Sequence, residues 1–385
     1  MTGRRRFLVV VPPLVGHVNP AVGVAAALTA RGHDVAWAGA PEVVGRLAGP
    51  RATVYPCATA HLADVRPPDL RGPAALKFLW ESFLIPLAEA MAPGVANAVD
   101  AYRPDVVLVD QQTVAGAAIA EARGIPWATS ATTSVELTDP LAAIPKAAAW
   151  LTATLTDLRH KLGAPGDGDL RFSPRLVLAF TTPELAGDRP GVRFVGPALA
   201  SRPDPADFPW EWLNSDTPTV LVTLGTVNAG TRFLGACLEA FAGRPGLRAV
   251  VVDPAGTAGP APGNVLLRPY VPQLDLLPHM RAVLCHAGHN TVCESLYHGL
   301  PLVVAPIRDD QPVVAQQVVD AGAGIRLRFG RATAAHIGDA IDAVLGDPRY
   351  RDAALRVQKS FHAAGGADAA ATHLEHLAGG SGDQH

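Results

Sequence analysis

Short, uninterrupted apolar runs that alternate with alanine-rich stretches constrain the fold of this chain more than any other feature. The runs are residues 7–11, 35–38, 106–109, 127–129, 220–224, 249–252, 282–285 and 302–305. Runs that are apolar throughout, rather than at every second residue, are typical of parallel strands covered on both faces. Helical patterns at residues 21–30, 114–122, 234–242 and 292–298 lie between them. This alternation predicts a doubly wound α/β fold.

The length and one proline-rich stretch predict two domains. The chain has 385 residues, and a single core rarely grows beyond about 250–300 residues. Prolines at 197, 203 and 205 mark a linker, and a new strand is predicted from Thr219. We therefore expect a first domain over residues 1–200, a linker over 201–218 and a second domain over 219–363. Residues 350–377 have a helical pattern, and residues 364–385 form the tail of the chain.

The charge and cysteine content exclude several classes of protein. Charged residues make up 17% of the chain and the net charge is −3, with no basic run beyond Arg4–Arg6, so no nucleic-acid partner is expected. The cysteines, Cys57, Cys237, Cys285 and Cys293, form no C-x-x-C pair and suit no zinc site. We expect reduced thiols and a cytoplasmic location.

The N-terminus resembles a signal peptide only in part. Arg4–Arg6 precede the apolar residues 7–15. Pro12, Pro13 and the segment 16–20 interrupt the run with turn-forming residues, whereas a membrane span needs about 20 mostly apolar residues in one helix. The pattern predicts a buried strand, a loop and then a helix, without stable membrane insertion.

The strongest local signal is a candidate phosphate-binding loop at residues 286–294, between a predicted strand and a predicted helix. Gly288 allows close approach of the backbone, and the free N–H groups at a helix start favour an anion. Asn290 and Thr291 are candidates both to cap this helix and to donate to phosphate oxygens, and His286 is a further donor. An ordinary capped helix after a tight turn is the alternative.

Three neighbouring loops carry side chains that suit a nucleotide sugar. Tyr270 offers a face for a pyrimidine, and Gln273 an amide for base or ribose. Asp310 and Gln311 follow another strand, and a carboxylate beside an amide can hold vicinal sugar hydroxyls. A third loop, containing Gly225 and Thr226, follows the first strand of this half and is predicted to contact the same phosphates.

Together these motifs resemble those of a known family. The order is an aromatic-x-Pro-Gln loop (270–273), a His-x-Gly-x-Asn-Ser/Thr-x-x-Glu segment (286–294) and an acidic residue followed by Gln (310–311). This series is similar to that of nucleotide-sugar-dependent glycosyltransferases of the GT-B architecture, especially plant secondary-metabolite and bacterial antibiotic-decorating enzymes. The resemblance implies two facing Rossmann-like domains with a cleft between them. It further implies that the first domain binds the acceptor, the second binds the nucleotide sugar, and the last helix crosses back to the first.

The resemblance also implies roles for individual residues. Tyr270 would stack on the base, Val271 and Gln273 would hold base and ribose, and Glu294 would bind the ribose hydroxyls. The diphosphate would contact His286, Asn290 and Thr291, and the sugar Asp310 and Gln311. Two departures leave the donor open: Tyr270 stands where plant enzymes have Trp, so the base is uracil or thymine, and Val314 replaces a frequent Asn.

A candidate catalytic pair lies in the first half. His17 follows the first predicted strand in a Gly-His-x-x-Pro loop, and Asp110 ends another strand. The resemblance implies that His17 is the base that deprotonates the acceptor and that Asp110 stabilises its charged form. It also implies inversion at the sugar carbon. The alternatives from the residues alone are a histidine that caps the following helix and an aspartate that caps the helix near Thr113.

No metal or other cofactor is expected, because the helix start and side-chain donors meet the phosphate charge. Asp167–Asp169 spell D-x-D but follow no strand, so we interpret them as a surface turn. Phe78, Trp80 and Phe83 are candidate acceptor-binding residues, with core packing as the alternative. Few charged residues nearby favour a small apolar or aromatic acceptor.

Two other functions remain open at this stage, a nucleotide-sugar epimerase and a non-catalytic nucleotide-sugar-binding helper subunit. Retention of His17, Asp110 and the whole donor loop favours the transferase. The sequence leaves open O-, N- or C-attachment, the sugar and the acceptor, and whether the chain forms a homodimer.

Overall fold

The computed structural model divides the chain into two compact units. It describes residues 3–58, 70, 72–138, 141–142, 144–200, 207–213, 216–225 and 230–380. Unit 1 comprises Met1–Phe180, Arg189–Pro203 and Ala364–His385, and unit 2 comprises Thr181–Asp188 and Asp204–Ala363. The chain therefore enters unit 2 at Thr181, within the predicted first domain, and returns to unit 1 for its final segment.

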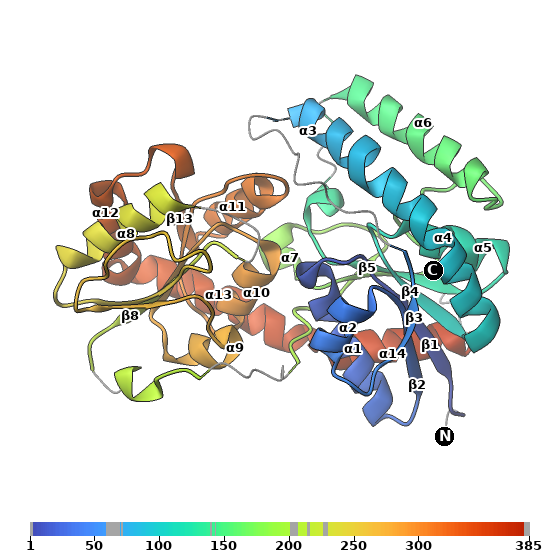
Figure 1. Ribbon diagram of the computed structural model, residues 1–385, viewed down its shortest axis with the longest axis horizontal. Coiled ribbons are helices and arrows are strands. Elements are labelled where there is room, and N and C mark those ends of the chain that lie inside the picture. The colour runs from blue at the N-terminus through green and yellow to red at the C-terminus, as the bar shows by residue number, and fades with distance from the viewer. Residues whose placement is uncertain are drawn as a thin grey trace. The chain divides into compact units, whose positions relative to one another are not determined.

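Unit 1 is built on a parallel sheet (Figure 1). Among its described residues the sheet has seven strands in the order β3-β2-β1-β4-β5-β6-β7. The strands are β1 (Arg6–Val10), β2 (Asp34–Gly39), β3 (Thr53–Pro56), β4 (Val106–Asp110), β5 (Trp127–Ala131), β6 (Val177–Ala179) and β7 (Val192–Phe194). The central position of β1 and β4 explains why their side chains are apolar on both faces, since helices cover the sheet on each side.

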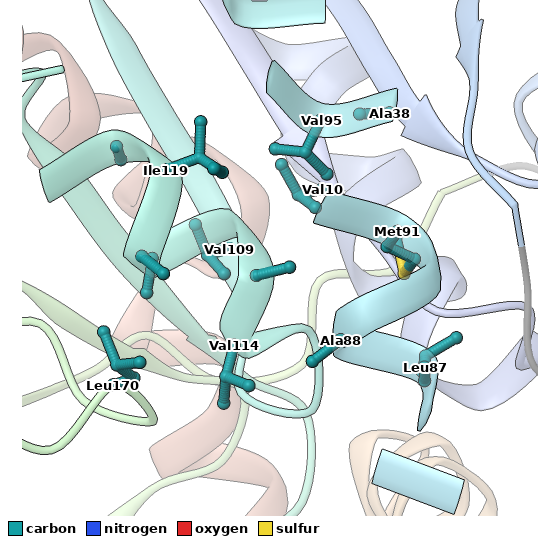
Figure 2. Packing of buried hydrophobic residues seen from close by; sticks show 14 of the residues in the cluster. Val10, Ala38, Leu87, Ala88, Met91, Val95, Val109, Val114, Ile119 and Leu170 are labelled. Atoms are coloured by element: carbon teal, nitrogen blue, oxygen red, sulfur yellow. The ribbon is translucent and has the colours of Figure 1, made fainter. Parts of the chain in front are cut away.

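Alternate residues of the central strands enter two different cores. Val10 and Val109 face α4 (Ile85–Tyr102) and α5 (Val114–Ala122), as Figure 2 shows for Val10, Val109 and Met91. Phe7 and Leu108 face the opposite core, which includes side chains of α1 (Val15–Ala30) and α14 (Gly366–Ala378). The remaining helices of unit 1 are α2 (Pro41–Ala48), α3 (Gly72–Leu79) and α6 (Pro145–Lys161).

Unit 2 repeats this arrangement with a second parallel sheet. Its described residues form six strands in the order β10-β9-β8-β11-β12-β13. The strands are β8 (Thr219–Thr223), β9 (Arg248–Val252), β10 (Val265–Arg268), β11 (Ala282–Cys285), β12 (Leu302–Val304) and β13 (Gly324–Arg326). The helices are α7 (Pro183–Ala186), α8 (Thr231–Ala242), α9 (Gln273–Leu276), α10 (His289–Tyr297), α11 (Gln311–Asp320), α12 (Ala334–Gly346) and α13 (Pro348–Ala364).

The strand predictions are confirmed, and two helix predictions need correction. All eight predicted strands coincide with observed ones to within two residues at each end. The first helix begins at Val15, not at residue 21, so Pro20 lies inside α1. The donor-loop helix α10 begins at His289, not at residue 292. Pro20 is the sixth residue of α1, so the helix lacks the hydrogen bond that a backbone N–H at this position would donate to the carbonyl of Gly16.

The helical pattern predicted over residues 350–377 forms two helices, α13 and α14. Gly365 separates α13 from α14 with a φ of 84°, a left-handed conformation that glycine adopts without strain. Leu374 of α14 is buried, and Arg31 at the end of α1 pairs with Asp368 and Glu375. The tail segment thus contributes to the core of unit 1.

One helical stretch among the described residues is long and apolar enough to cross a membrane by length and composition. It runs over Gly72–Tyr102, with a π-helical turn at Trp80–Leu84. Met91 and Val95 from this stretch are completely buried in the core of unit 1. Packing against the sheet therefore accounts for its hydropathy.

We predict that Leu374→Ala destabilises unit 1 by about 2–5 kcal/mol, because the truncated side chain leaves a cavity between α14 and the sheet. Urea unfolding followed by circular dichroism measures this loss. Ile144→Ala, which shortens a side chain 37% exposed in the same unit, should cost less than about 1 kcal/mol. Equal losses in the two variants would contradict the burial of α14.

Candidate active site

A hydrogen-bonded histidine and carboxylate lie at the carboxyl edge of the unit 1 sheet. His17 is in the first turn of α1, and Asp110 is the last residue of β4. The imidazole Nδ1 of His17 is 3.0 Å from both carboxylate oxygens of Asp110. An ionised carboxylate only accepts hydrogen bonds, so Nδ1 carries the proton and Nε2 of the neutral ring is left as the basic nitrogen.

Thr132 completes this arrangement. Its Oγ1 donates to Oδ2 of Asp110 at 2.7 Å and lies 2.8 Å from Nδ1 of His17. The backbone N–H of Gln112 donates to Oδ1 of Asp110 at 2.9 Å. The side chain of Asp110 is inaccessible to water, whereas that of His17 is 16% exposed. The carboxylate is therefore held by fixed donors, and the imidazole keeps access to a reactant.

The sheet register explains why these residues meet. β1, β4 and β5 are adjacent and parallel, with Val10 opposite Val109 and Asp110 opposite Ser130. Their carboxyl ends therefore share one edge, where ligands bind in open α/β sheets. The sequence analysis identified His17 and Asp110 but missed Thr132. A polar run directly after a predicted strand, Thr132–Ser134, was the signal that could have found it.

A second charged cluster follows β5. Oε2 of Glu136 is 3.4 Å from Nη1 of Arg171, and the Arg171 guanidinium also binds Asp169. Arg189 donates to the backbone carbonyl of Glu136 at 2.7 Å. The pKa of Glu136 is raised, chiefly by burial and further by the nearby carboxylates of Asp169 and Asp110. Arg171 and His17 oppose this shift only in part. The D-x-D segment thus supplies an ion-pair partner for Arg171. The described residues contain no group of three or more His, Cys, Asp or Glu side chains that could hold a metal ion.

The donor loop of unit 2 centres on His286, which follows β11. The ring is buried, and a Cβ on Gly288 would lie 2.5 Å from its Nε2. Gly225, with a φ of 74°, approaches it equally closely, since a Cβ there would lie 2.8 Å from Cε1. The pKa of His286 is lowered to about 4, mainly by burial. A hydrogen bond to the Thr223 backbone raises the pKa in part, and the charge of Arg308 lowers it further. The imidazole is therefore neutral at pH 7, and its buried Nδ1 has no hydrogen-bond partner among the described residues.

The start of α10 has the features of an anion site. Ala287 adopts a φ of 64°, a region that non-glycine residues enter at a cost and that clusters at functional sites. Gly288 occupies the N-cap position, so the cap residue itself contributes no side-chain hydrogen bond. The predicted capping role of Asn290 and Thr291 is thus wrong, because the helix begins one and two residues before them. Their predicted role as phosphate donors stays a prediction.

The nucleoside-binding candidates occupy suitable positions at the same edge of the sheet. Tyr270 is 57% exposed, as a stacking surface requires, while Val271 is buried. Nε2 of Gln273 donates to Oε2 of Glu294 at 2.6 Å, which fixes both side chains. Glu294 lies on α10 and is buried.

The sugar-binding candidates lie at the start of α11. Asp310 is the N-cap residue of that helix. Oε1 of Gln311 accepts from the backbone N–H groups of Ile307 and Arg308 at 2.9 and 3.0 Å. Gln311 therefore shapes its own loop through its oxygen, which leaves its amide nitrogen for a sugar hydroxyl. Thr226 lies outside the described residues.

Two of the three acceptor candidates belong to the core. Trp80 and Phe83 are buried in the hydrophobic cluster of unit 1, so the core-packing alternative holds for them. Phe78 is half-buried on α3 and stays a candidate. Trp80 and Phe83 both lie in the π-helical turn Trp80–Leu84.

Comparison with known proteins identifies the class. Residues 257–366 match the family described as UDP-glucoronosyl and UDP-glucosyl transferase. The chain is 30% identical to 4'-demethylrebeccamycin synthase of Lentzea aerocolonigenes, over 93% of this chain and 96% of that protein. It is 32% identical to demethyllactenocin mycarosyltransferase of Streptomyces fradiae, over 95% of this chain and 85% of that protein.

Solved structures agree with these relatives. The glycotransferase of kitacinnamycin superposes with a TM-score of 0.79 at 26% identity, covering 98% of this chain and 100% of that one. A spinosyn rhamnosyltransferase complexed with thymidine diphosphate gives a TM-score of 0.75 at 25% identity, covering 96% and 100%. The predicted fold class, two Rossmann-like α/β domains of the GT-B type, is confirmed. The protein is a glycosyltransferase, and it belongs to the nucleotide-sugar-dependent family of these enzymes.

We predict that Gly288→Ala weakens binding of a nucleoside diphosphate about tenfold or more, because the new Cβ displaces His286 from the donor loop. Calorimetric titration with UDP and with dTDP measures the change. Gly263→Ala is the matched control, since a Cβ there meets no atom within 4 Å. Unchanged affinity in Gly288→Ala would contradict the assignment of this loop to the donor.

Proposed function

We propose that the protein is an inverting glycosyltransferase that moves a sugar from a UDP- or dTDP-sugar onto a small natural-product acceptor, with His17 as the general base. The observation that carries this proposal is the contact of His17 Nδ1 with a water-inaccessible carboxylate, Asp110. The contact fixes the tautomer that leaves Nε2 as the base. The relatives support the reaction class, since two of them are named for transfers within antibiotic synthesis.

In the proposed reaction Nε2 of His17 takes the proton from the acceptor hydroxyl as the oxygen attacks the anomeric carbon. The new carbon–oxygen bond forms while the bond to the nucleoside diphosphate breaks, and the diphosphate leaves with the electron pair. Asp110 stabilises the imidazolium that results, and Thr132 holds the carboxylate in place. A single displacement of this kind inverts the configuration of the sugar carbon.

For the donor, we infer that the diphosphate binds at the start of α10. Backbone N–H groups and the helix dipole meet the phosphate charge there, and the dipole contributes about 0.3–1 kcal/mol, or up to about 2 kcal/mol in a partly buried site. Asn290, Thr291 and neutral His286 are the proposed side-chain donors. Tyr270 would stack on the base, the Glu294–Gln273 pair would hold the ribose, and Asp310 with Gln311 would bind the sugar. No metal is needed in this scheme.

The acceptor is proposed to be small and apolar or aromatic. The relatives are named for a rebeccamycin derivative and for a lactenocin derivative, which places their acceptors among natural products. A cytoplasmic location is also proposed. All four cysteines lie within the described residues and are buried free thiols, as expected in a reducing compartment.

We predict that His17→Ala lowers kcat/KM by about 10²–10⁴-fold, because positioned proton transfer is lost. Purified protein is incubated with a panel of UDP- and dTDP-sugars in EDTA, and free nucleoside diphosphate is measured with and without phenolic and polyketide acceptors. Binding of dTDP or UDP should remain, since the donor residues belong to unit 2. His160→Ala, an exposed histidine of α6, should keep full activity.

Three outcomes would contradict the proposal. Full activity of His17→Ala would remove the assigned base. Conversion of the donor sugar without any acceptor would identify an epimerase. Binding of the donor without turnover, for every acceptor of the panel, would favour a helper subunit.

A further inference from the structure

A buried amide without hydrogen-bond partners lies directly beside the proposed catalytic pair. The residue is Gln111, which follows Asp110 and is 2% exposed. Neither Oε1 nor Nε2 of its side chain has a hydrogen-bond partner among the residues that the structure describes. A buried polar group left unpaired costs about 1–3 kcal/mol, and native proteins contain few of them. The fold therefore gains no stability from the polarity of this side chain.

Backbone contacts fix the place of Gln111 at the carboxyl edge of the unit 1 sheet. Its N–H donates to the carbonyl of Ser130 at 3.2 Å, and the N–H of Gln112 donates to Oδ1 of Asp110 at 2.9 Å. The same carboxylate oxygen is 3.0 Å from Nδ1 of His17. Consecutive Cα atoms are about 3.8 Å apart, so the side chain of Gln111 begins next to the residue that binds the proposed base.

A second unpaired group lies at the same edge. Ser130 is opposite Asp110 in the register of β4 and β5, and its buried Oγ also lacks a partner within the described part of the chain. By contrast, the buried hydroxyl of Thr113, two residues after Gln111, donates to the carbonyl of Asp110 at 2.9 Å. The same turn thus satisfies one buried polar side chain and leaves Gln111 unsatisfied.

We propose that Gln111 recognises the acceptor by hydrogen bonding to a second hydroxyl group next to the one that reacts. This inference rests on the proposed function and on the role of His17 in it. A carboxamide both donates and accepts hydrogen bonds, and a hydroxyl group does the same, so either end of the amide can bind it. A neutral amide suits an uncharged group. The acceptor class that follows is an apolar or aromatic molecule with two neighbouring hydroxyl groups.

The amide can reach an acceptor by rotation of its own side chain. Glutamine has a flexible side chain, and side chains at binding sites commonly change rotamer when a partner binds. Because Oε1 and Nε2 make no hydrogen bond to the described residues, the rotation breaks none with them. The backbone bonds to Ser130 and Asp110 hold the turn in place. Recognition therefore needs the movement of one side chain and no change of the fold.

The test is the variant Gln111→Met, which keeps an unbranched side chain of similar length and removes both amide atoms. Loss of an unpaired buried polar group should leave the midpoint of urea unfolding unchanged or raise it. Tyr102→Phe is the matched control, because it removes another buried, unpartnered polar atom of unit 1, at the end of α4 and before β4 begins. Thr113→Val, which removes a bonded hydroxyl, should lower the midpoint.

The kinetic measurement compares luteolin, which has two neighbouring hydroxyl groups, with apigenin, which lacks one of them. The wild-type protein should favour luteolin about tenfold in kcat/KM, the effect of one net hydrogen bond. Gln111→Met should lose this preference through a higher KM for luteolin, with the affinity for UDP and dTDP unchanged. Tyr102→Phe should keep the preference, since its hydroxyl lies at the other edge of the sheet.

Three results would overturn the inference. The first is a lower urea midpoint in Gln111→Met, which would mean that the fold uses the amide. The second is equal kcat/KM for luteolin and apigenin in the wild-type protein, or reaction of monohydroxylated acceptors alone. The third is an unchanged preference for luteolin in Gln111→Met. Failure of the proposed function is distinguishable, because it appears as full activity in His17→Ala or as no turnover with any acceptor.

Discussion

Asp110 is an acidic side chain with no access to water, and the chemistry of unit 1 depends on how its charge is met. Burial of an uncompensated carboxylate is costly, so its hydrogen bonds to His17, Thr132 and the backbone of Gln112 are required for the fold as well as for the site. Each donor comes from a different part of the chain. The parallel register of β1, β4 and β5 brings them to one edge of the sheet. A shift of any of these strands would remove a hydrogen-bond donor from the Asp110 carboxylate while leaving the carboxylate buried.

In unit 2 the polar groups at the corresponding sheet edge belong to the backbone of a turn and not to a buried carboxylate. The His286–Gly288 turn holds Ala287 in a left-handed conformation and places a glycine at the N-cap position of α10. The closeness of Gly225 and Gly288 to the His286 ring excludes any larger residue at those two positions. Both units thus place strained or buried polar groups at the carboxyl edge of a sheet whose central strands are mostly apolar. The packing of the sheets offsets the unfavourable free energy of these strained and buried polar groups.

The sequence predicted the central strands because burial on both faces leaves a continuous apolar run. It missed the four edge strands, β3, β7, β10 and β13, and also β6, which lies beside an edge. The start of α1 was misplaced because Pro20 was taken as a helix breaker, whereas the helix continues through it. Trp80 and Phe83 were ambiguous because an aromatic residue in a helix looks alike whether it faces a ligand or a core. Thr132 could not be assigned, since its importance comes from contacts with His17 and Asp110, which lie far away in the sequence.

The central claim is that one base, held by one buried carboxylate, drives a single displacement at the sugar carbon. The configuration of the product tests it most directly. With an α-linked UDP- or dTDP-sugar as donor, the proton coupling constants of the purified product report the configuration of its anomeric carbon. The account predicts a β-linked product, with the configuration inverted. An α-linked product would require a double displacement or a front-face reaction, and it would contradict the role assigned to His17 and Asp110.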